Sequence, residues 1–433
     1  MKHLSRRGLG SKALAIILIV IIIAGVAGYY FTAHKGKKKV GPGEDVITVG
    51  FTAPLTGPYR DVGQAFLNGL KLWASKVNSQ GGIVINGKSY NIYLKYYDDK
   101  GDPKETAKLY KKLIEEDYAD FLITPPLGDC ALQAINVAEG HGKIIIDVTS
   151  GDQIFQTGLK YTYQIATPAS RIFTPVLDLA KSLDPNSTKI AIIAIDTPES
   201  RGIASGVKVW AGTNNYQIVF EYYYAPGTKN FDNLARIVAQ KSPDIIIGGG
   251  GIEETINLVK ALYNAGVRPK LIALMGGPLT DEFAKLGNLA LGVMGVSEWE
   301  SVATYSPFQA KKLNATWYGP GVTEFTVSYE KAYGIPPTST AASAYAAGLV
   351  LQYALEKAQS LSSADIEQVL DHVRLLTFYG LIQFDNTPEL HGLQIAHEPI
   401  VVQWMLRGGN MVKLVVAPKE FAVAKPIYPL PWK

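Results

Sequence analysis

Apolar residues recur along this chain with two spacings, one typical of strands and one typical of helices. Residues 47–55 form an apolar run rich in strand-forming side chains and predict a strand. From Asp61 the spacing becomes helical, and Gly81-Gly82 should end that helix. Its apolar face carries Val62, Phe66, Leu70, Trp73 and Val77. Another helix is predicted from Asp102, where a capping residue is followed by proline and then by Glu105.

The alternation of strand and helix continues through most of the chain. Further strands are expected at 92–97, 121–124, 144–147, 163–166, 190–195, 218–224, 245–247, 271–274, 293–296, 381–384, 400–404 and 412–416. Further helices are expected at 130–139, 172–181, 202–211, 231–241, 254–265, 327–333, 341–358 and 364–373. Such alternation produces parallel sheets covered on both faces, so two successive arrays predict two doubly wound α/β lobes. The proline-containing tail at 418–433 is expected to be an extended arm.

The N-terminus follows a different pattern. Residues 1–12 are basic and 13–28 are continuously apolar or small, which predicts an export signal. Cleavage near Ala27 would release the body of the protein. Cleavage near Ala13, at a site that resembles those of prepilin-like signals, would keep the apolar helix as a membrane anchor. We favour an anchored exoprotein, with 1–31 as signal or anchor and 32–45 as a basic Gly/Pro stalk.

Charge and cysteine content exclude several classes of protein. The formal net charge of the chain is +4, but residues 1–43 hold eight of the 42 basic residues and no acid. The remainder, with 34 basic and 38 acidic residues, has a net charge of −4. It therefore lacks the excess of positive charge that nucleic-acid binding requires. Cys130 is the only cysteine, which excludes an internal disulfide and Cys-rich metal sites.

One segment satisfies a phosphate-binding pattern by spacing alone. Residues 82–89 match G-x4-G-K-S, a motif that works between a strand and a helix. Here the predicted helix comes first and a β-rich run follows. The segment is therefore interpreted as a hairpin with Asn86-Gly87 at its turn.

Motifs for catalysis or metal binding are missing from the sequence. The acidic run at 98–102 fails as a calcium loop, because its twelfth position is Leu109 and not glutamate. The six histidines form no H-E-x-x-H or H-x3-H pair, and no G-x-S-x-G occurs. We therefore expect no enzyme, no metal and no cofactor.

The predicted strand-to-helix corners are rich in Gly, Ser, Thr and Asp. They lie at 53–59, 124–129, 147–151, 196–200, 248–251 and 276–278. Ligands of open α/β sheets bind beyond the carboxyl ends of the strands, so two facing lobes predict a cleft for a small polar ligand. The four glycines at 248–251 fit either a tight turn or a close approach of ligand to backbone.

Several motifs in order resemble the branched-chain amino-acid-binding type of solute receptor of ABC importers. They are VGFTAPLTGP at 49–58, NSQGGI at 78–83, YDD at 97–99 with Asp102-Pro103, the Ala-rich segment 341–357 and YGLIQFD at 379–385. The likeness covers about residues 46–416, nearly all of the body. It implies a type I periplasmic binding protein, in which two lobes are joined by three hinge crossings.

The resemblance also implies lobe boundaries. Lobe 1 would comprise 44–168 plus 301–380, and lobe 2 would comprise 169–300 plus 381–417, before the arm. The crossings are expected near 167–171, 298–301 and 380–384. A ligand would bind between the lobes, the hinge would close, and a membrane permease would recognise the closed form.

Positions of the family's ligand-binding residues carry over onto this chain as expectations. The first-lobe serine falls at Gly128, or at Leu127 if the alignment shifts by one residue, and the next corner falls at Thr149, Ser150 and Gly151. Two second-lobe aromatics fall at Glu199 and Gly251, and the acid that holds a ligand's amino group falls near Gly277, where no acid stands. Asp129 and Glu199 are interpreted as its replacements, which favours a cationic or hydroxyl-rich ligand. Tyr59, Arg60 and Tyr305 are expected at the mouth of the cleft.

These observations predict an extracytoplasmic, monomeric solute-binding protein of an ABC importer, whose ligand is an amino acid or a related small polar molecule. An extracellular ligand-sensing receptor domain is the alternative. An enzyme such as an amidase is a second rival, disfavoured because no triad or metal cluster is visible.

Overall fold

The computed structural model describes residues 45–433, of which 47–433 form one compact unit. The expected signal, anchor and stalk fall on residues outside the described part of the chain, apart from Asp45. No helix within 45–433 is both long enough and apolar enough to cross a bilayer.

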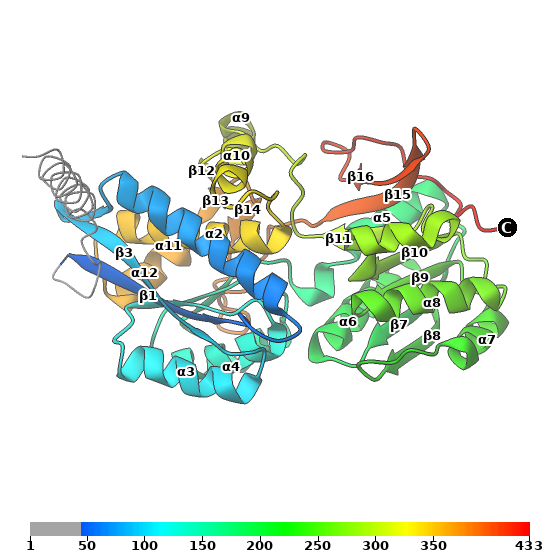
Figure 1. The fold of residues 1–433 in the computed structure, drawn as a ribbon, viewed down its shortest axis with the longest axis horizontal. Helices are drawn as coiled ribbons and strands as arrows, with labels where there is room; N and C mark the ends of the chain where they lie inside the picture. Colours follow the sequence, from blue (N-terminus) through cyan, green and yellow to red (C-terminus); the bar gives the residue numbers. More distant parts are fainter. Residues whose placement is uncertain (1–44) are drawn as a thin grey trace, which may run out of the picture. The chain divides into compact units, whose positions relative to one another are not determined.

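The first lobe is built on a six-stranded sheet with the strand order β2-β3-β1-β4-β5-β6. Its strands are β1 (Val46–Ala53), β2 (Ile83–Ile85), β3 (Lys88–Asp98), β4 (Phe121–Ile123), β5 (Ile145–Asp147) and β6 (Thr162–Gln164). Strands β1, β4, β5 and β6 run parallel. Helices α2 (Arg60–Ser79) and α11 (Ser339–Ala358) cover one face, and α3 (Pro103–Glu115) and α4 (Gly128–Gly140) cover the other (Figure 1).

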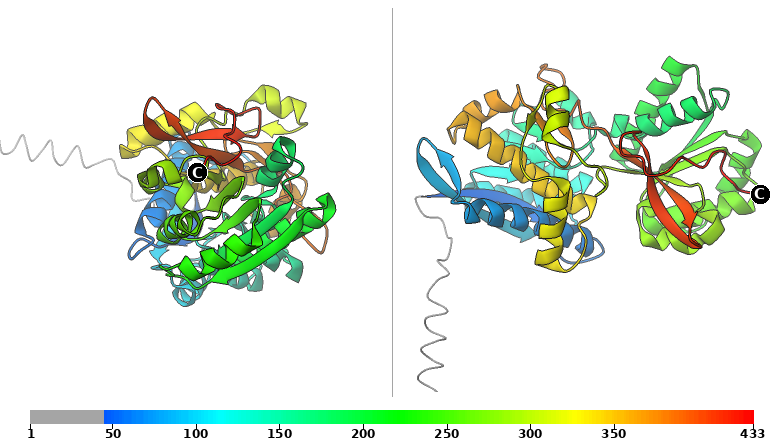
Figure 2. Two further views of the ribbon diagram at one scale, coloured as in Figure 1. Left: turned by 90° about the vertical axis from the view of Figure 1, so that its right-hand side faces the viewer. Right: turned by 90° about the horizontal axis from the view of Figure 1, so that it is seen from above.

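The second lobe is built on a seven-stranded sheet with the order β16-β15-β11-β10-β9-β7-β8. Its strands are β7 (Lys189–Ile195), β8 (Gln217–Tyr224), β9 (Ile245–Gly249), β10 (Leu271–Met275), β11 (Met294–Ser297), β15 (Ile400–Arg407) and β16 (Asn410–Ala417). Helices α5 (Thr174–Leu183) and α6 (Pro198–Asn214) lie on one face, with α7 (Asp232–Lys241) and α8 (Ile252–Asn264) on the other. The antiparallel pair β15–β16, red in Figure 2, forms one edge.

Burial on both faces explains the continuous apolar runs of the central strands. In β7, Ile190 and Ile192 belong to the core beneath α5 and α6, whereas Ala191 and Ile193 belong to the core beneath α7 and α8. Successive side chains of a strand point to opposite faces, so a strand covered twice must be apolar at every position. Both sheets therefore have the doubly wound architecture that the alternation predicts.

A smaller three-stranded sheet belongs to the first lobe. It contains β12 (Thr316–Trp317), β13 (Arg374–Leu376) and β14 (Leu381–Gln383), and the helices of this part of the chain are α9 (Pro307–Lys312), α10 (Val322–Tyr333) and α12 (Ser363–Leu370). Ile382 pairs with Leu375 and is buried in the same core as Phe51 of β1. The expected third crossing near 380–384 is therefore wrong, because this segment is paired within the first lobe.

Three segments of chain connect the lobes, at 165–168 after β6, at 298–306 after β11 and at 395–399 before β15. The third crossing begins only after Phe384 has bridged to Gln394. Residues 381–394 thus belong to the first lobe instead of the second. The boundary between the lobes lies after residue 394 and not after residue 380.

Two other expectations concern the hairpin and the C-terminal arm. Strands β2 and β3 form an antiparallel hairpin whose turn residues, Asn86 and Gly87, both have positive φ (49° and 78°). This confirms the hairpin and rules out a phosphate loop. The arm at 418–433 contains neither helix nor strand and packs on the second lobe, where Leu430 and Trp432 are buried.

Candidate functional site

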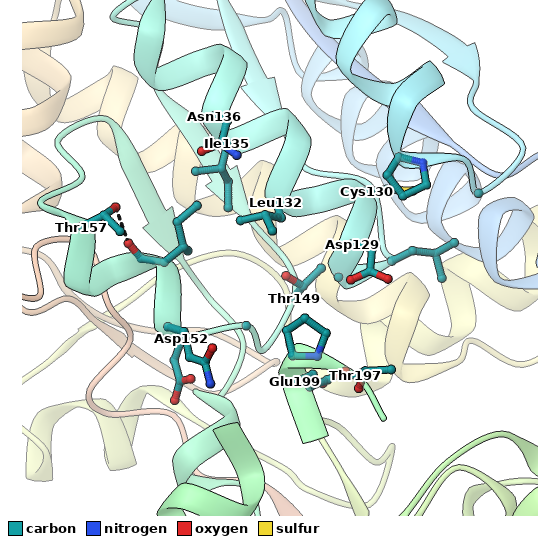
Figure 3. A pocket seen from close by; sticks show the side chains of 18 of the residues that line it. Asp129, Cys130, Leu132, Ile135, Asn136, Thr149, Asp152, Thr157, Thr197 and Glu199 are labelled. Carbon is teal, nitrogen blue, oxygen red and sulfur yellow. Dashed lines mark hydrogen bonds between the residues drawn. The ribbon is translucent and has the colours of Figure 1, made fainter. Parts of the chain in front are cut away.

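A cavity of 760 Å³ lies beyond the carboxyl ends of β4 and β5 in the first lobe and of β7 in the second. This volume is in the upper half of the range usual for small-molecule sites. The residues that line it are Tyr59, Gly101, Pro103, Leu127, Gly128, Asp129, Cys130, Leu132, Ile135, Asn136, Thr149, Gly151, Asp152, Gln153, Ile154, Thr157, Thr197, Pro198 and Glu199. Figure 3 shows ten of these side chains labelled.

The N-terminus of α4 forms one wall of the cavity. Pro125 and Pro126 favour extended backbone between β4 and the helix, which then begins at Gly128. No side chain caps this end, and Ala131 is the first residue whose N–H donates into the helix, to the Leu127 carbonyl at 2.8 Å. The N–H groups of the first turn are therefore available to donate hydrogen bonds to a ligand, and the helix dipole favours negative charge there.

The corner after β5 is held by a buried carboxylate. Asp147 Oδ1 accepts hydrogen bonds from the Thr149 N–H (3.0 Å), the Thr149 hydroxyl (2.9 Å) and the Thr124 hydroxyl (2.9 Å). Its Oδ2 has no hydrogen-bond partner within the described residues. Burial raises the pKa of Asp147 to about 6, so the carboxylate is mostly ionised at neutral pH. Asp147 thus fixes Thr149 at the cavity wall.

The wall continues along a short helix, η1 (Gln153–Thr157). Asp152, which precedes it, is buried and its Oδ2 accepts from the Ser170 N–H at 2.8 Å. Ser170 lies in η2 (Ala169–Arg171), directly after the first crossing. The Thr157 hydroxyl donates to the Ile154 carbonyl at 2.7 Å, so this helical turn is closed by its own side chain.

The second lobe contributes the start of α6. Thr197 caps this helix by accepting from the Ser200 N–H at 3.2 Å, and Pro198 occupies its first turn. This cap explains why α6 begins four residues before the predicted start. Glu199 is half-buried; desolvation raises its pKa, and the charges of Asp129, Asp152 and Asp147 raise it further.

A buried polar cluster joins the three crossings. Glu298 Oε2 accepts from the Thr167 N–H at 2.9 Å and lies 3.4 Å from His397 Nδ1. His397 Nδ1 is also 2.9 Å from the Thr167 hydroxyl, and its Nε2 is 3.2 Å from the Tyr379 carbonyl. Burial lowers the pKa of His397 to about 4. The neutral imidazole then donates through Nε2 to Tyr379 and accepts from Thr167 through Nδ1.

Burial also raises the pKa of Glu298, to about 7, and the negative charge of Glu199 contributes to the rise. Glu298 belongs to the second crossing, Thr167 to the first and His397 to the third. The segments about which the lobes would move are therefore tied to one another through Thr167, whose N–H donates to Glu298 and whose hydroxyl donates to His397.

The structure brings six of the eight predicted ligand-binding residues to the cavity. They are Tyr59, Gly128, Asp129, Thr149, Gly151 and Glu199. Ser150 and Gly251 do not line it, and neither do Arg60 and Tyr305, which were expected at its mouth. Tyr305 instead packs edge-on against Phe421, 4.9 Å between ring centroids.

The glycines before Gly251 are required by strand packing. A Cβ on Gly248 would lie 1.9 Å from the Ile193 carbonyl oxygen, and one on Gly249 would lie 2.5 Å from the backbone of Met275. Gly251 itself is the N-terminal cap residue of α8. Close approach of neighbouring strands thus accounts for Gly248 and Gly249, an explanation that is neither the tight turn nor the ligand contact that the sequence suggested.

The sequence analysis did not predict the part of the cavity that is lined by α4 beyond its first turn and by η1. Asp129, Leu132 and Asn136 share one face of α4, and their spacing of three and four residues was a signal that could have placed them together. Ile154 and Thr157 follow the predicted corner by only a few residues. Asp152 adjoins Gly151 but was not considered.

One cluster brings a histidine and two acids together away from the cavity. Ligand-type atoms of Glu367, Asp371 and His391 lie within 4.8 Å of one another. Asp371 Oδ1 accepts from the Tyr163 hydroxyl at 2.7 Å and lies 2.7 Å from His391 Nε2. These hydrogen bonds explain the cluster without an ion, since they tie the loop after β14 to α12.

Comparison with known proteins agrees with the fold. The family model described as periplasmic binding protein matches residues 46–405. The Leu/Ile/Val-binding protein homolog 3 of Brucella melitensis is 24% identical over 350 residues, which are 79% of this chain and 88% of the relative.

Two solved structures have the same fold. A solute-binding protein of an ABC transporter from R. palustris, in complex with benzoate, has a TM-score of 0.65 and 21% identity, covering 88% of this chain and 98% of its own. The branched-chain amino acid transporter substrate-binding protein of Streptococcus pneumoniae, in complex with isoleucine, has a TM-score of 0.66 and 19% identity, covering 86% and 100%.

Two α/β lobes, three crossings and an interlobe cavity define a solute-binding protein of type I architecture. The chain belongs to the periplasmic binding protein family. Members of this family are extracytoplasmic binding proteins and not enzymes.

Proposed function

We propose that this protein is the substrate-binding component of an ABC importer, and that it captures an amino acid or a related small polar solute between its lobes for delivery to a membrane permease. The observation that supports this most is the convergence of residues from both lobes on one cavity. Gly128, Asp129 and Thr149 come from the first lobe and Glu199 from the second, at the sheet edges where ligands of α/β folds bind.

In this proposal the two ends of an amino acid meet different walls. A carboxylate would accept hydrogen bonds from the first-turn N–H groups of α4, around Gly128. An ammonium group would lie between Asp129 and Glu199 and donate to the Thr149 hydroxyl oxygen. Tyr59, which is about half exposed, would cover the entrance.

Binding would be coupled to closure, because Asp129 and Glu199 belong to different lobes. A solute that contacts both is held better when the lobes approach, so it shifts the population toward the closed form. A permease that recognises the closed form would then accept only the loaded protein. We further propose that the apolar segment at 13–31 anchors the protein outside the membrane and so raises its effective concentration near that permease.

Thermal unfolding of the purified protein against amino acids, amides, small carboxylates, amines and sugars tests the proposal. A solute at 100 times its Kd adds about 2.7 kcal/mol to stability, enough to shift the midpoint by several degrees. The solute should be recovered unchanged after incubation, whereas an amidase would convert it. If no small solute in the panel shifts the midpoint, the proposed function is wrong.

Two matched pairs of variants locate the site. Asp129→Asn and Glu199→Gln should abolish most of the shift. Asp232→Asn and Glu253→Gln also change acids in the first turns of helices, α7 and α8, but neither residue lines the cavity, so the shift should persist. Equal effects of both pairs would contradict this placement.

The anchor is tested separately by fractionation of cells that express the full chain. The protein should remain with the membranes after washing with high salt or carbonate and be released by detergent. Recovery of an N-terminally shortened protein in the soluble fraction would show that the signal is removed.

A further inference from the structure

Two carboxylates from opposite lobes face the cavity without a partner. Asp129 and Glu199 both line it, and neither makes a hydrogen bond or ion pair within the described part of the chain. Figure 3 labels both: Asp129 belongs to the first turn of α4 in the first lobe, and Glu199 to the first turn of α6 in the second. Each is therefore available to a ligand.

The three threonine hydroxyl groups of the cavity already donate their protons within the protein. Thr149 donates to Asp147 at 2.9 Å, Thr157 to the Ile154 carbonyl at 2.7 Å, and Thr197 to the Ser200 hydroxyl at 3.1 Å. A hydroxyl has one proton, so the groups that remain on all three are acceptor lone pairs. The threonines thus present the same polarity to a ligand as the carboxylates do.

Positive charge is missing from the same wall. None of the residues that line the cavity is lysine or arginine, whereas Asp129, Asp152 and Glu199 are all acidic. Asp152 is occupied by the Ser170 N–H, which leaves Asp129 and Glu199 as the two acids of the wall without a hydrogen-bond or ion-pair partner. Like charges on the two lobes oppose one another as the lobes approach, so closure without a ligand is disfavoured.

From these contacts we infer that the solute is a primary amine or another cation with N–H donors, and that its positive charge, placed between Asp129 and Glu199, is what permits the lobes to close. The inference rests on the proposed function and narrows it. A carboxylate on the solute is compatible with the α4 N-terminus but is not what the cavity selects. Anions that lack an amine are excluded, because they would add charge of the same sign to the pair.

The remaining lining residues favour a solute that also carries an apolar group. Leu132 and Ile135 of α4 face the space near η1, together with Ile154. Asn136 and Thr157 are the polar residues at this end. The cationic group and the apolar end of the solute would therefore lie at opposite ends of the cavity.

Probes that share one apolar group and differ in charge separate the possibilities. Leucine is a zwitterion, 3-methylbutylamine retains only its amine, 4-methylpentanoate retains only its carboxylate, and 4-methylpentanamide carries no charge. Benzylamine, benzoate and benzamide form a second set with a larger apolar group. Binding of each is measured by calorimetry and by the shift of the thermal midpoint.

Within each set we expect the amine-bearing probes to bind more tightly than the others by about tenfold to a hundredfold, the usual range for hydrogen bonds to a charged group. Binding of the acid or the amide as tightly as the amine would overturn the inference and leave the proposed function standing. Binding of no probe of any charge would overturn both.

Variants test the carboxylates directly. Asp129→Asn and Glu199→Gln should each weaken amine binding by about tenfold or more and should narrow the difference between amine and amide. Because neither side chain has a partner, the unliganded variants should unfold at or above the midpoint of the unmodified protein, which shows that they fold. Glu253→Gln should change nothing. Unchanged amine binding in both cavity variants would contradict the assigned role.

Discussion

The carboxyl group of Glu298, at the meeting point of the three crossings, provides the sharpest test of the structure. Glu298 accepts from the Thr167 N–H at 2.9 Å and touches His397, so it links segments far apart in sequence. Glu298→Gln keeps an oxygen for the Thr167 N–H but removes the ionisable group. The variant should fold and retain the hinge contacts.

The expected effect depends on pH. The pKa of Glu298 is raised from 4.5 to about 7 in the folded protein, so the folded state holds this proton more tightly than the unfolded state does. The resulting stability is complete below pH 4.5 and is lost as the pH rises through 7. The total is about 3 kcal/mol. This figure is an upper value, since the side chain is 22% exposed and water screens part of the charge.

Urea unfolding followed by tryptophan fluorescence at pH values from 5.5 to 8 measures the effect. Over this interval the stability of Glu298→Gln relative to the unmodified protein should rise by about 2 kcal/mol. The lowered pKa of His397 also makes the protein less stable as the pH falls from 6.5 through about 4. Because His397 is present in both proteins, this effect cancels in the comparison. Glu253→Gln, an exposed carboxylate, should show no such trend. A difference for Glu298→Gln that stays constant with pH would refute the burial argument.

Further predictions concern the packing of the lobes, and urea unfolding measures each. Gly348→Ala should cost about 1–3 kcal/mol, because the new methyl would lie 2.2 Å from the Trp73 ring; Gly212→Ala, with no atom within 4 Å, should instead stabilise its helix by about 0.5–1 kcal/mol. Asp102→Ala should cost about 1 kcal/mol by removing the cap of α3, and an unchanged midpoint would contradict the cap. Trp432→Ala should cost about 3–5 kcal/mol if the arm packs on the second lobe as described, whereas an arm detached in solution would leave stability unchanged.

Local patterns predicted most of the fold. Strands such as β7, apolar at nearly every position, and helices with one apolar face alternate so regularly that two doubly wound lobes follow from spacing alone. The third crossing was misplaced because its position depends on β14 pairing with β13, a contact whose partners cannot be read from composition. The link among Thr167, Glu298 and His397 was invisible for the same reason.

The residues of the candidate site that directly follow a strand could be predicted from the sequence. Those farther along the helices could not. Gly128, Thr149 and Glu199 lie at corners directly after a strand, and the sheet edge brings them together. The apolar end depends on which face of α4 meets η1, which is a tertiary contact. Gly251 was misplaced because a glycine that caps a helix, as Gly251 caps α8, looks in sequence like one required by a ligand.

The central claim is that a solute is held between the lobes by Asp129 and Glu199. A crystal structure of the protein grown with the probe that raises the thermal midpoint most would test it directly. The account predicts density for an amine between these carboxylates, beside Thr149 and the start of α4, with the lobes closer than in the unliganded protein. Density for the probe outside this cavity, or at the α4 N-terminus with no contact to either carboxylate, would contradict it.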